Sequence, residues 1–155
     1  RPKSRGFVEI KSNNYLDDPK IQFNYLEHEE DLQQMRDSIK IANKIFNQES
    51  MKKYLGDQLR PGYDATDNEL DDIIRNTADT AYHPSCTNKM GTDSMSVVDE
   101  ETKVYGVENL RVIDSSIMPD ILSGNLNAGT IMIAEKAADM ILKREEAPID
   151  ADYYS

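Results

Sequence analysis

Hydrophobic and polar residues alternate in two short stretches near the start of the chain, residues 6–11 and residues 20–25. A period of two places successive side chains on opposite faces of a β-strand, so each stretch predicts a half-buried strand. Residues 13–19, between them, are rich in asparagine and aspartate and end on proline, which favours a turn. We therefore expect two antiparallel strands joined by a turn-rich loop.

Two later stretches have the spacing of amphipathic helices. From about Glu29 to Phe46, apolar residues recur at steps of three and four, which indicates a helix with one buried face. Its acidic first turn, residues 29–31, lies at the favourable end of the helix dipole, and we expect these carboxylates to be solvated. A second helix is predicted from Thr66 to about Ala78, because Thr66 followed by Glu69 is the signature of a capping box.

The second half of the chain combines extended segments with one apolar helix. Residues 82–91 lack a helical period and indicate a strand or an extended loop, and residues 95–99 predict a short strand. Leu110–Asp114 is a short apolar run that ends on a carboxylate, which predicts another strand. Turn and cap residues follow at 123–127, before an apolar helix over 128–142. This order of elements predicts a mixed α and β fold.

The strand, loop and helix over 110–142 form the first candidate binding site. Where a strand ends at a helix N-terminus, free backbone N–H groups and the positive end of the helix dipole converge. A phosphate or an electron-rich ring can bind there without a cationic side chain. Asn127 either caps this helix or directs its amide at a bound substrate, and the two roles are compatible.

Composition limits the classes of partner. The formal charge of −11 argues against a nucleic-acid partner, because phosphate contacts need clustered lysine and arginine. The longest apolar stretch is interrupted by charged residues, so no membrane span is expected, while a peripheral membrane contact stays open. The chain has 38% hydrophobic residues, lacks tryptophan and begins at Arg1. We expect it to be a piece of a longer protein whose remainder covers part of its apolar surface.

His83 is the candidate base, since histidine is the usual side chain that takes a proton from a hydroxyl near neutral pH. The alternative is a structural histidine in a strand, and His28, beside acidic residues at a helix start, is assigned to the surface. Cys86 is the single cysteine, which excludes an internal disulfide, argues against a zinc site and suits a reducing compartment. As a nucleophile it would need a thiolate-stabilising neighbour, and a small buried cysteine is the commoner state.

Five separated motifs resemble the C-terminal part of a glucose-methanol-choline (GMC) oxidoreductase, in the same order and at matching spacing. They are His83–Gly91, Ser96–Asp99, Gly106–Pro119, Gly124–Thr130 and Ile133–Asp139. The opening residues 1–6 fit the same family. The resemblance therefore covers nearly the whole chain and is far more specific than a lone signature.

The resemblance implies an FAD-dependent alcohol oxidation. His83 stands where the family's histidine takes the substrate hydroxyl proton while a hydride leaves the same carbon for the flavin. Hydride loss is easier from an alkoxide-like carbon, so a base within hydrogen-bond reach lowers that barrier. The second family position, histidine in some members and asparagine in others, falls on Asn127. An asparagine cannot be the base, so Asn127 would position the hydroxyl instead.

The resemblance also implies cofactor contacts at the start of the last helix. That helix N-terminus would face the flavin and favour the negative charge that a reduced flavin accumulates. Gly124 and Gly129 would allow a close backbone approach. The implied cofactor-binding residues are Asp114, Ser115, Asn125, Asn127, Ala128 and Thr130. For the first two of these, a turn at the end of a strand is the alternative explanation.

The resemblance divides the chain into functional parts, with an α+β or α/β fold class. Residues 1–109 would form the substrate-binding portion, an antiparallel sheet with flanking helices. Residues 110–145 would supply a strand and a helix to a Rossmann-like FAD-binding domain, and residues 146–155 would be a tail. No GxGxxG motif occurs among the seven glycines. The family's N-terminal FAD-binding portion is therefore an expected partner, and the segment alone is expected to be inactive.

Within the family, the motifs most resemble those of choline-oxidising members. The expected reaction is choline to betaine aldehyde, on the route to glycine betaine, with an electron acceptor that the sequence does not identify. The alternatives are another primary alcohol as substrate, or a non-enzymatic acidic interaction fragment. The expected location is the cytoplasm, with peripheral membrane association as an option.

Overall fold

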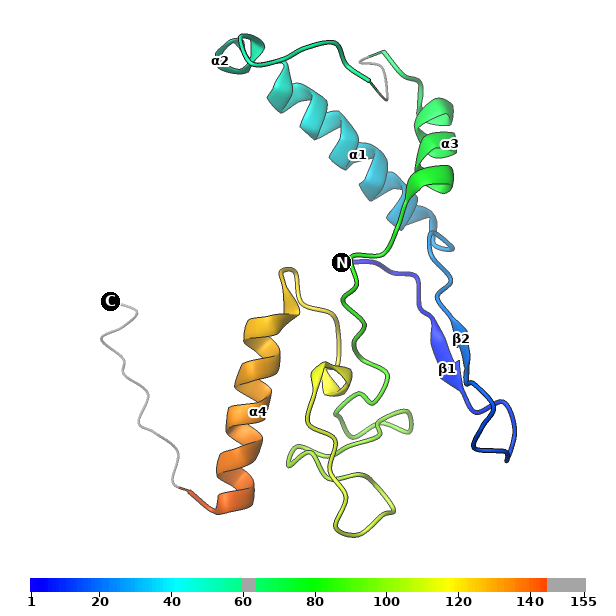
Figure 1. The fold of residues 1–155 in the computed structure, drawn as a ribbon, viewed down its shortest axis with the longest axis vertical. Coiled ribbons are helices and arrows are strands. Elements are labelled where there is room, and N and C mark those ends of the chain that lie inside the picture. Colours follow the sequence, from blue (N-terminus) through cyan, green and yellow to red (C-terminus); the bar gives the residue numbers. More distant parts are fainter. Residues whose placement is uncertain (60–63, 145–155) are drawn as a thin grey trace. The chain divides into compact units, whose positions relative to one another are not determined.

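The computed structural model describes residues 1–59 and 64–144, and its order of elements is mixed α and β (Figure 1). The elements are β1 (Phe7–Glu9), β2 (Lys20–Gln22), α1 (Glu29–Phe46), α2 (Glu49–Lys52), α3 (Asp67–Thr77), the 3₁₀ helix η1 (Ser115–Ile117) and α4 (Leu126–Leu142). The chain forms two compact units, one of Pro2–Ala81 and one of Arg1 with the chain from Tyr82 onward. Helices with a small antiparallel sheet confirm the predicted α+β character at this coarse level.

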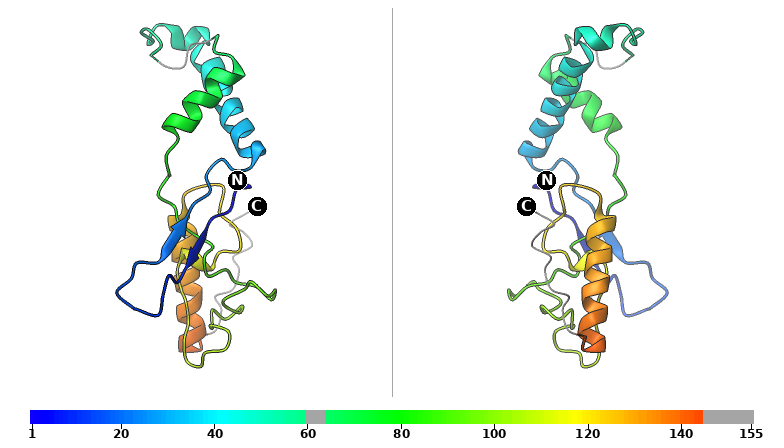
Figure 2. Two further views of the ribbon diagram at one scale, coloured as in Figure 1. Left: turned by 90° about the vertical axis from the view of Figure 1, so that its right-hand side faces the viewer. Right: turned by 90° about the vertical axis from the view of Figure 1, so that its left-hand side faces the viewer.

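Strands β1 and β2 form the predicted antiparallel ribbon, seen from two sides in Figure 2. The register pairs Phe7 with Gln22, Val8 with Ile21 and Glu9 with Lys20. Both strands are shorter than predicted, and the expectation that they are half-buried is wrong, because every residue of both strands is exposed. A two-stranded ribbon is only marginally stable by itself. The apolar side chains of Phe7, Val8 and Ile21 in this ribbon are exposed.

Helices α1 and α3 pack against each other around a small apolar core. Leu32 of α1 and Leu70 and Ile74 of α3 are each at most 2% exposed. Full burial of such a side chain contributes about 1.5–3 kcal/mol relative to leaving it in water. Both helices were predicted: α1 has the predicted bounds, and α3 follows the capping box that Thr66 and Glu69 form as expected. Helix α2 was not predicted, because it spans four residues and buries none of them.

The first turn of α1 contradicts one expectation. Asp31 is 7% exposed rather than solvated, and its carboxylate accepts hydrogen bonds from the backbone N–H groups of Lys3 and Ser4 and from the Ser4 hydroxyl. Burial raises the pKa of Asp31, but these hydrogen bonds outweigh it and hold that pKa below its ordinary value of 3.8. Asp31 therefore ties the N-terminal segment to α1.

The unit that begins at Tyr82 contains single β-bridges where two strands were predicted. Val98, which is fully buried, bridges to Met90 and to Val104, and Lys103 bridges to Arg111. The strands predicted at residues 95–99 and 110–114 are therefore wrong. The physical reason is a series of tight turns. The Asp99 carboxylate accepts from the N–H groups of Glu101 and Lys103, and Thr102 has a left-handed φ of +67°, so the chain turns directly after residues 95–99. Residues 110–114 begin after Asn109, which has a left-handed φ of +59°, and end where Asp114 caps η1.

Residues 114–142 turn through η1 into α4. The Asp114 side chain caps η1 by accepting from the Ser116 N–H at 2.7 Å. Helix α4 starts at Leu126, two residues before the predicted start, and ends at Leu142 as predicted. A Cβ atom at Gly129 would lie 2.6 Å from Leu122 Cδ1. The small residue at position 129 therefore lets the preceding loop pack on the helix.

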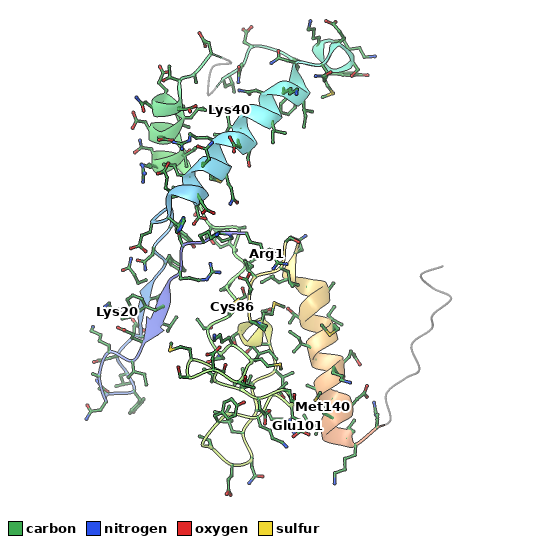
Figure 3. The ribbon with its side chains drawn as sticks, turned by 180° about the vertical axis from the view of Figure 1, so that it is seen from behind. Arg1, Lys20, Lys40, Cys86, Glu101 and Met140 are labelled. Carbon is green, nitrogen blue, oxygen red and sulfur yellow. The ribbon has the colours of Figure 1, made fainter. Side chains whose placement is uncertain are left out.

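Much of the surface of α4 is apolar, including Ile131 and Met132, which are 54% and 61% exposed. Figure 3 shows the helix with its side chains, with Met140 near its C-terminal end. Among the described residues, no helix is both long enough and apolar enough to cross a membrane. The predicted tail at 146–155 lies outside the described residues.

Candidate active site

The segment that carries His83 is fixed to η1 by three backbone hydrogen bonds. The N–H groups of Cys86, Asn88 and Met90 donate to the carbonyls of Ser115, Ser116 and Ile117 at 3.3, 2.9 and 2.7 Å. Figure 3 shows Cys86 on this segment beside η1. Just before it, Tyr82 has a left-handed φ of +57°, which is unusual for a bulky residue. His83 therefore lies between a sharp backbone turn at Tyr82 and the stretch that is hydrogen-bonded to η1.

His83 faces the N-terminus of α4 across an open concavity of about 510 Å³. The lining residues are Tyr82, His83, Pro84, Ser115, Asn125, Leu126, Asn127 and Thr130. The imidazole is half-buried, and its Nε2 lies 3.0 Å from Oδ1 of Asn125. An imidazole and two carboxamides thus meet at one surface, which is an arrangement suited to holding and deprotonating a hydroxyl group.

Asn125, not Asn127, occupies the N-cap position of α4, so the expectation that Asn127 caps the helix is wrong. The Asn125 side chain makes no capping hydrogen bond to its own helix. The backbone N–H groups of the first turn of a helix have no partner within the helix. At α4 they stay available to an electron-rich ligand, as predicted for this helix start.

Two residues with hydroxyl groups, Ser115 and Thr130, line the same concavity. The Ser115 Oγ and the Thr130 Oγ1 are 2.5 Å apart, and the Thr130 hydroxyl donates to the Leu126 carbonyl at 2.8 Å. Ser115 belongs to η1 and Thr130 to the first turns of α4. The hydrogen bond therefore joins the two elements that carry most of the predicted cofactor-binding residues.

The structure brings together some predicted site residues and leaves others aside. His83, Ser115, Asn125, Asn127 and Thr130 all line the concavity. Asp114 and Ala128 are not among the lining residues; the first caps η1 and the second is exposed in the first turn of α4. The Cys86 thiol donates to the Ser85 hydroxyl at 3.4 Å, which is a neutral neighbour and not an imidazole.

Sequence reasoning missed the direct contact between His83 and Asn125. Asn125 and Asn127 stand two residues apart at a helix start, and their spacing alone does not tell which side chain faces the base. Pro84 and Leu126 were also missed, because an apolar wall residue beside a polar site carries no signal in a single sequence. The left-handed backbone at Tyr82 had no signal either, since no glycine or asparagine marks it.

Comparisons with known proteins agree on one family. Residues 2–134 match the family model described as GMC oxidoreductase. Proteins named oxygen-dependent choline dehydrogenase from Cronobacter sakazakii and Pseudomonas fluorescens are each 53% identical to this chain, over 96% and 99% of its length. These matches cover 27% and 28% of the two relatives, so the chain spans little more than a quarter of their length.

Solved structures give the same result. Pyridoxine 4-oxidase from Mesorbium loti matches with a TM-score of 0.85 and 30% identity, over 94% of this chain and 28% of that protein. An FAD-dependent oxidoreductase from Chaetomium thermophilum matches with a TM-score of 0.82 and 35% identity, over 89% of this chain and 24% of that protein.

Proposed function

The chain belongs to the GMC oxidoreductase family, and we propose that it is the C-terminal part of an FAD-dependent enzyme that oxidises choline to betaine aldehyde. The observation that carries the proposal is the meeting of His83, Asn125 and Asn127 at one concavity, beside a helix N-terminus without a side-chain cap. The names of the relatives support choline as the substrate. The chain spans about a quarter of their length, and we propose that chain outside this segment supplies the other parts of the site.

The residues present fit the flavin part of FAD. The carbonyl oxygens of an isoalloxazine ring need hydrogen-bond donors, and the uncapped first turn of α4 supplies N–H groups together with the positive end of the helix dipole. The Asn127 side chain can add an amide donor. Bound FAD would supply the hydride acceptor. The family's glycine-rich motif is absent from this chain, so we propose that its N-terminal portion holds the rest of the cofactor.

We assign the role of base to His83. An imidazole nitrogen that faces a polar, half-open concavity can take the proton of an alcohol placed within hydrogen-bond distance. Removing that proton gives the carbon alkoxide character, which lowers the barrier to hydride loss. In the contact with Asn125 the Nε2 atom donates, because an amide oxygen only accepts, so Nε2 can serve as the base only in the other imidazole tautomer, with the substrate hydroxyl in place of Asn125 Oδ1.

The two carboxamides are assigned to orientation. Asn125 contacts the imidazole directly and fixes the direction of its ring. Asn127 lines the same concavity and is the group that we propose positions the substrate hydroxyl. Replacing each by alanine and measuring flavin reduction by stopped flow compares them. If the Asn127 variant reduces its flavin at the wild-type rate, the positioning role belongs to Asn125 alone.

Tyr82 supports a cationic alcohol as the substrate. Its ring is 76% exposed and lines the concavity beside the base. A quaternary ammonium group on an aromatic face gains about 0.5–2 kcal/mol. Other groups that hold the ammonium would come from chain outside this segment. We also propose residues 1–109 as the substrate-binding portion, with residues 110–145 completing the FAD-binding domain.

The names of the relatives also bear on the electron acceptor. The relatives are named oxygen-dependent, which makes molecular oxygen the candidate acceptor. For the location, we propose the cytoplasm with a peripheral membrane contact.

The test is the absorbance spectrum of the complete protein that contains this chain. We expect a bound flavin whose visible absorbance bleaches when choline is added without oxygen. Bleaching by another primary alcohol, and not by choline, would keep the flavoenzyme and replace the substrate. A colourless, stable protein would reject the enzyme and favour an acidic interaction fragment.

A further inference from the structure

The hydroxyl groups of Ser115 and Thr130 form a short relay at the concavity. The Ser115 Oγ lies 2.5 Å from the Thr130 Oγ1, and the Thr130 Oγ1 lies 2.8 Å from the Leu126 carbonyl oxygen. Both side chains line the concavity. The relay ends at a carbonyl, which can only accept a hydrogen bond.

Counting hydrogens favours one direction of the relay. Each hydroxyl carries one hydrogen, and the Thr130 hydrogen is directed to the Leu126 carbonyl. Either hydroxyl could donate in the 2.5 Å contact taken alone, but both hydrogen bonds are made together only when Ser115 donates to Thr130. With its single hydrogen engaged, the Ser115 oxygen can offer only lone pairs to a ligand. The reverse direction would sacrifice the hydrogen bond to Leu126, so the relay favours one polarity.

We propose that Ser115 accepts a hydrogen bond from the flavin part of FAD and that Thr130 sets the polarity of that acceptor. The inference rests on the proposed function. The donors in the flavin part are the ring N–H of its pyrimidine edge and the hydroxyls of its ribityl chain, whereas its carbonyls are acceptors. An acceptor at Ser115 beside the N–H donors of α4 matches a ligand that presents both kinds of group.

The test is the affinity of the complete apoprotein for FAD, measured by titration with flavin fluorescence as the readout. Ser115→Ala should raise the Kd about 10-fold, because a donor of the flavin then lacks its acceptor. Ser123→Ala is the matched control, since Ser123 is exposed in the loop before α4 and is not among the lining residues. Its Kd should equal that of the wild type.

Thr130 variants test the polarity. Thr130→Ser keeps the relay and should keep the affinity. Thr130→Val keeps the size but removes the acceptor of the Ser115 hydrogen, so that hydrogen can turn toward the flavin donor and the Kd should rise about 3-fold or more. If Ser115→Ala fails to fold, Thr130→Val carries the same test.

The outcomes separate two failures. A wild-type protein that binds no FAD rejects the proposed function and this inference together. A wild-type protein that binds FAD and is bleached by choline, with both Ser115→Ala and Thr130→Val binding FAD as tightly, overturns this inference alone. If Ser115→Ala does weaken FAD binding, FAD methylated at its ring N–H identifies the donor. Loss of the Ser115→Ala effect with this probe assigns the ring N–H, and an unchanged effect assigns a ribityl hydroxyl.

Discussion

The N-cap side chain of α3 hydrogen-bonds to the first turn of its helix, whereas the N-cap side chain of α4 does not. At α3, the Thr66 hydroxyl accepts from the Glu69 N–H at 3.3 Å, and the Glu69 carboxylate accepts from the Thr66 N–H at 2.8 Å. Hydrogen bonds from the Thr66 backbone and hydroxyl lower the pKa of Glu69. At α4, the N-cap residue is Asn125, an equally good capping type, yet its side chain turns to His83.

We interpret the start of α3 as serving folding and the start of α4 as serving ligand binding. A side-chain cap contributes about 1 kcal/mol to the stability of a helix. Helix α3 gains that contribution, and α4 leaves its N–H groups and its dipole facing the concavity. Helix α4 is stabilised instead by packing, with Leu126 and Ala137 buried. The exposed N-terminus of α4 is therefore expected to matter for ligand binding and little for folding.

The largest expected effect is on turnover, at the concavity beside the start of α4. In the complete protein, His83→Ala should lower the turnover number by about 10²- to 10⁴-fold, because a positioned base is lost. The flavin should stay bound, since the N-terminus of α4 is unchanged. Steady-state kinetics with choline and the flavin absorbance measure both. Retained turnover would remove His83 from the role of base.

A smaller effect is expected on the unfolding free energy, at Asp31 of α1. Asp31→Ala leaves the N–H groups of Lys3 and Ser4 without their acceptor, which should cost about 2–3 kcal/mol of unfolding free energy. The matched control is Glu30→Ala, whose carboxylate forms an exposed ion pair with Lys3 and should change little. Denaturant unfolding followed by circular dichroism measures both variants. Equal stabilities would show that the buried carboxylate anchors nothing.

The lowered pKa of Asp31 predicts that the unfolding free energy falls at acidic pH. The hydrogen bonds to Asp31 outweigh its burial and lower its pKa below 3.8, so the unfolded chain binds the proton more tightly than the folded chain. The stabilisation by Asp31 is therefore present above about pH 4 and is lost as the pH falls through the lowered pKa. The unfolding free energy of Asp31→Asn should therefore fall less at acidic pH than that of the wild type.

The sequence predicted elements well where a local pattern decides the structure. The bounds of α1 and the capping box at Thr66 follow from apolar spacing and from one residue pair, and both are confirmed. It failed at residues 95–99, where a turn stabilised by Asp99 follows a single bridge. It failed also at residues 110–114, which lie between the left-handed Asn109 and η1. It also failed at Asp31, because its partners Lys3 and Ser4 are distant in sequence and are not visible to a periodic pattern.

At the candidate site, the sequence predicted residue types better than contacts. His83 and Asn127 were selected from motifs, and the structure places both at the concavity. The choice between Asn125 and Asn127 as neighbour of the imidazole depends on where α4 starts. Helix starts are poorly fixed by sequence when an apolar residue such as Leu126 follows a turn. The catalytic and cofactor roles themselves stay predictions.

The next effect compares the two helix starts directly. Thr66→Ala should lower the unfolding free energy by about 1 kcal/mol, because it removes the acceptor of the Glu69 N–H. Thr66→Ser keeps the hydroxyl and should be close to neutral. Flavin affinity and turnover of the complete protein should not change in either variant. A loss of turnover without a loss of stability would contradict the assignment of this cap to folding.

The smallest expected change in stability is at Asn125. Asparagine at an N-cap usually contributes about 1 kcal/mol, but this side chain makes no bond to α4, so Asn125→Ala should cost less than about 0.5 kcal/mol. The same variant should slow flavin reduction, because the imidazole of His83 loses the contact that orients it. Denaturant unfolding and stopped-flow reduction measure the two effects on one protein. If Asn125→Ala instead destabilises the protein as much as Thr66→Ala and leaves reduction unchanged, then Asn125 is an ordinary cap and the two helix starts do not differ in purpose.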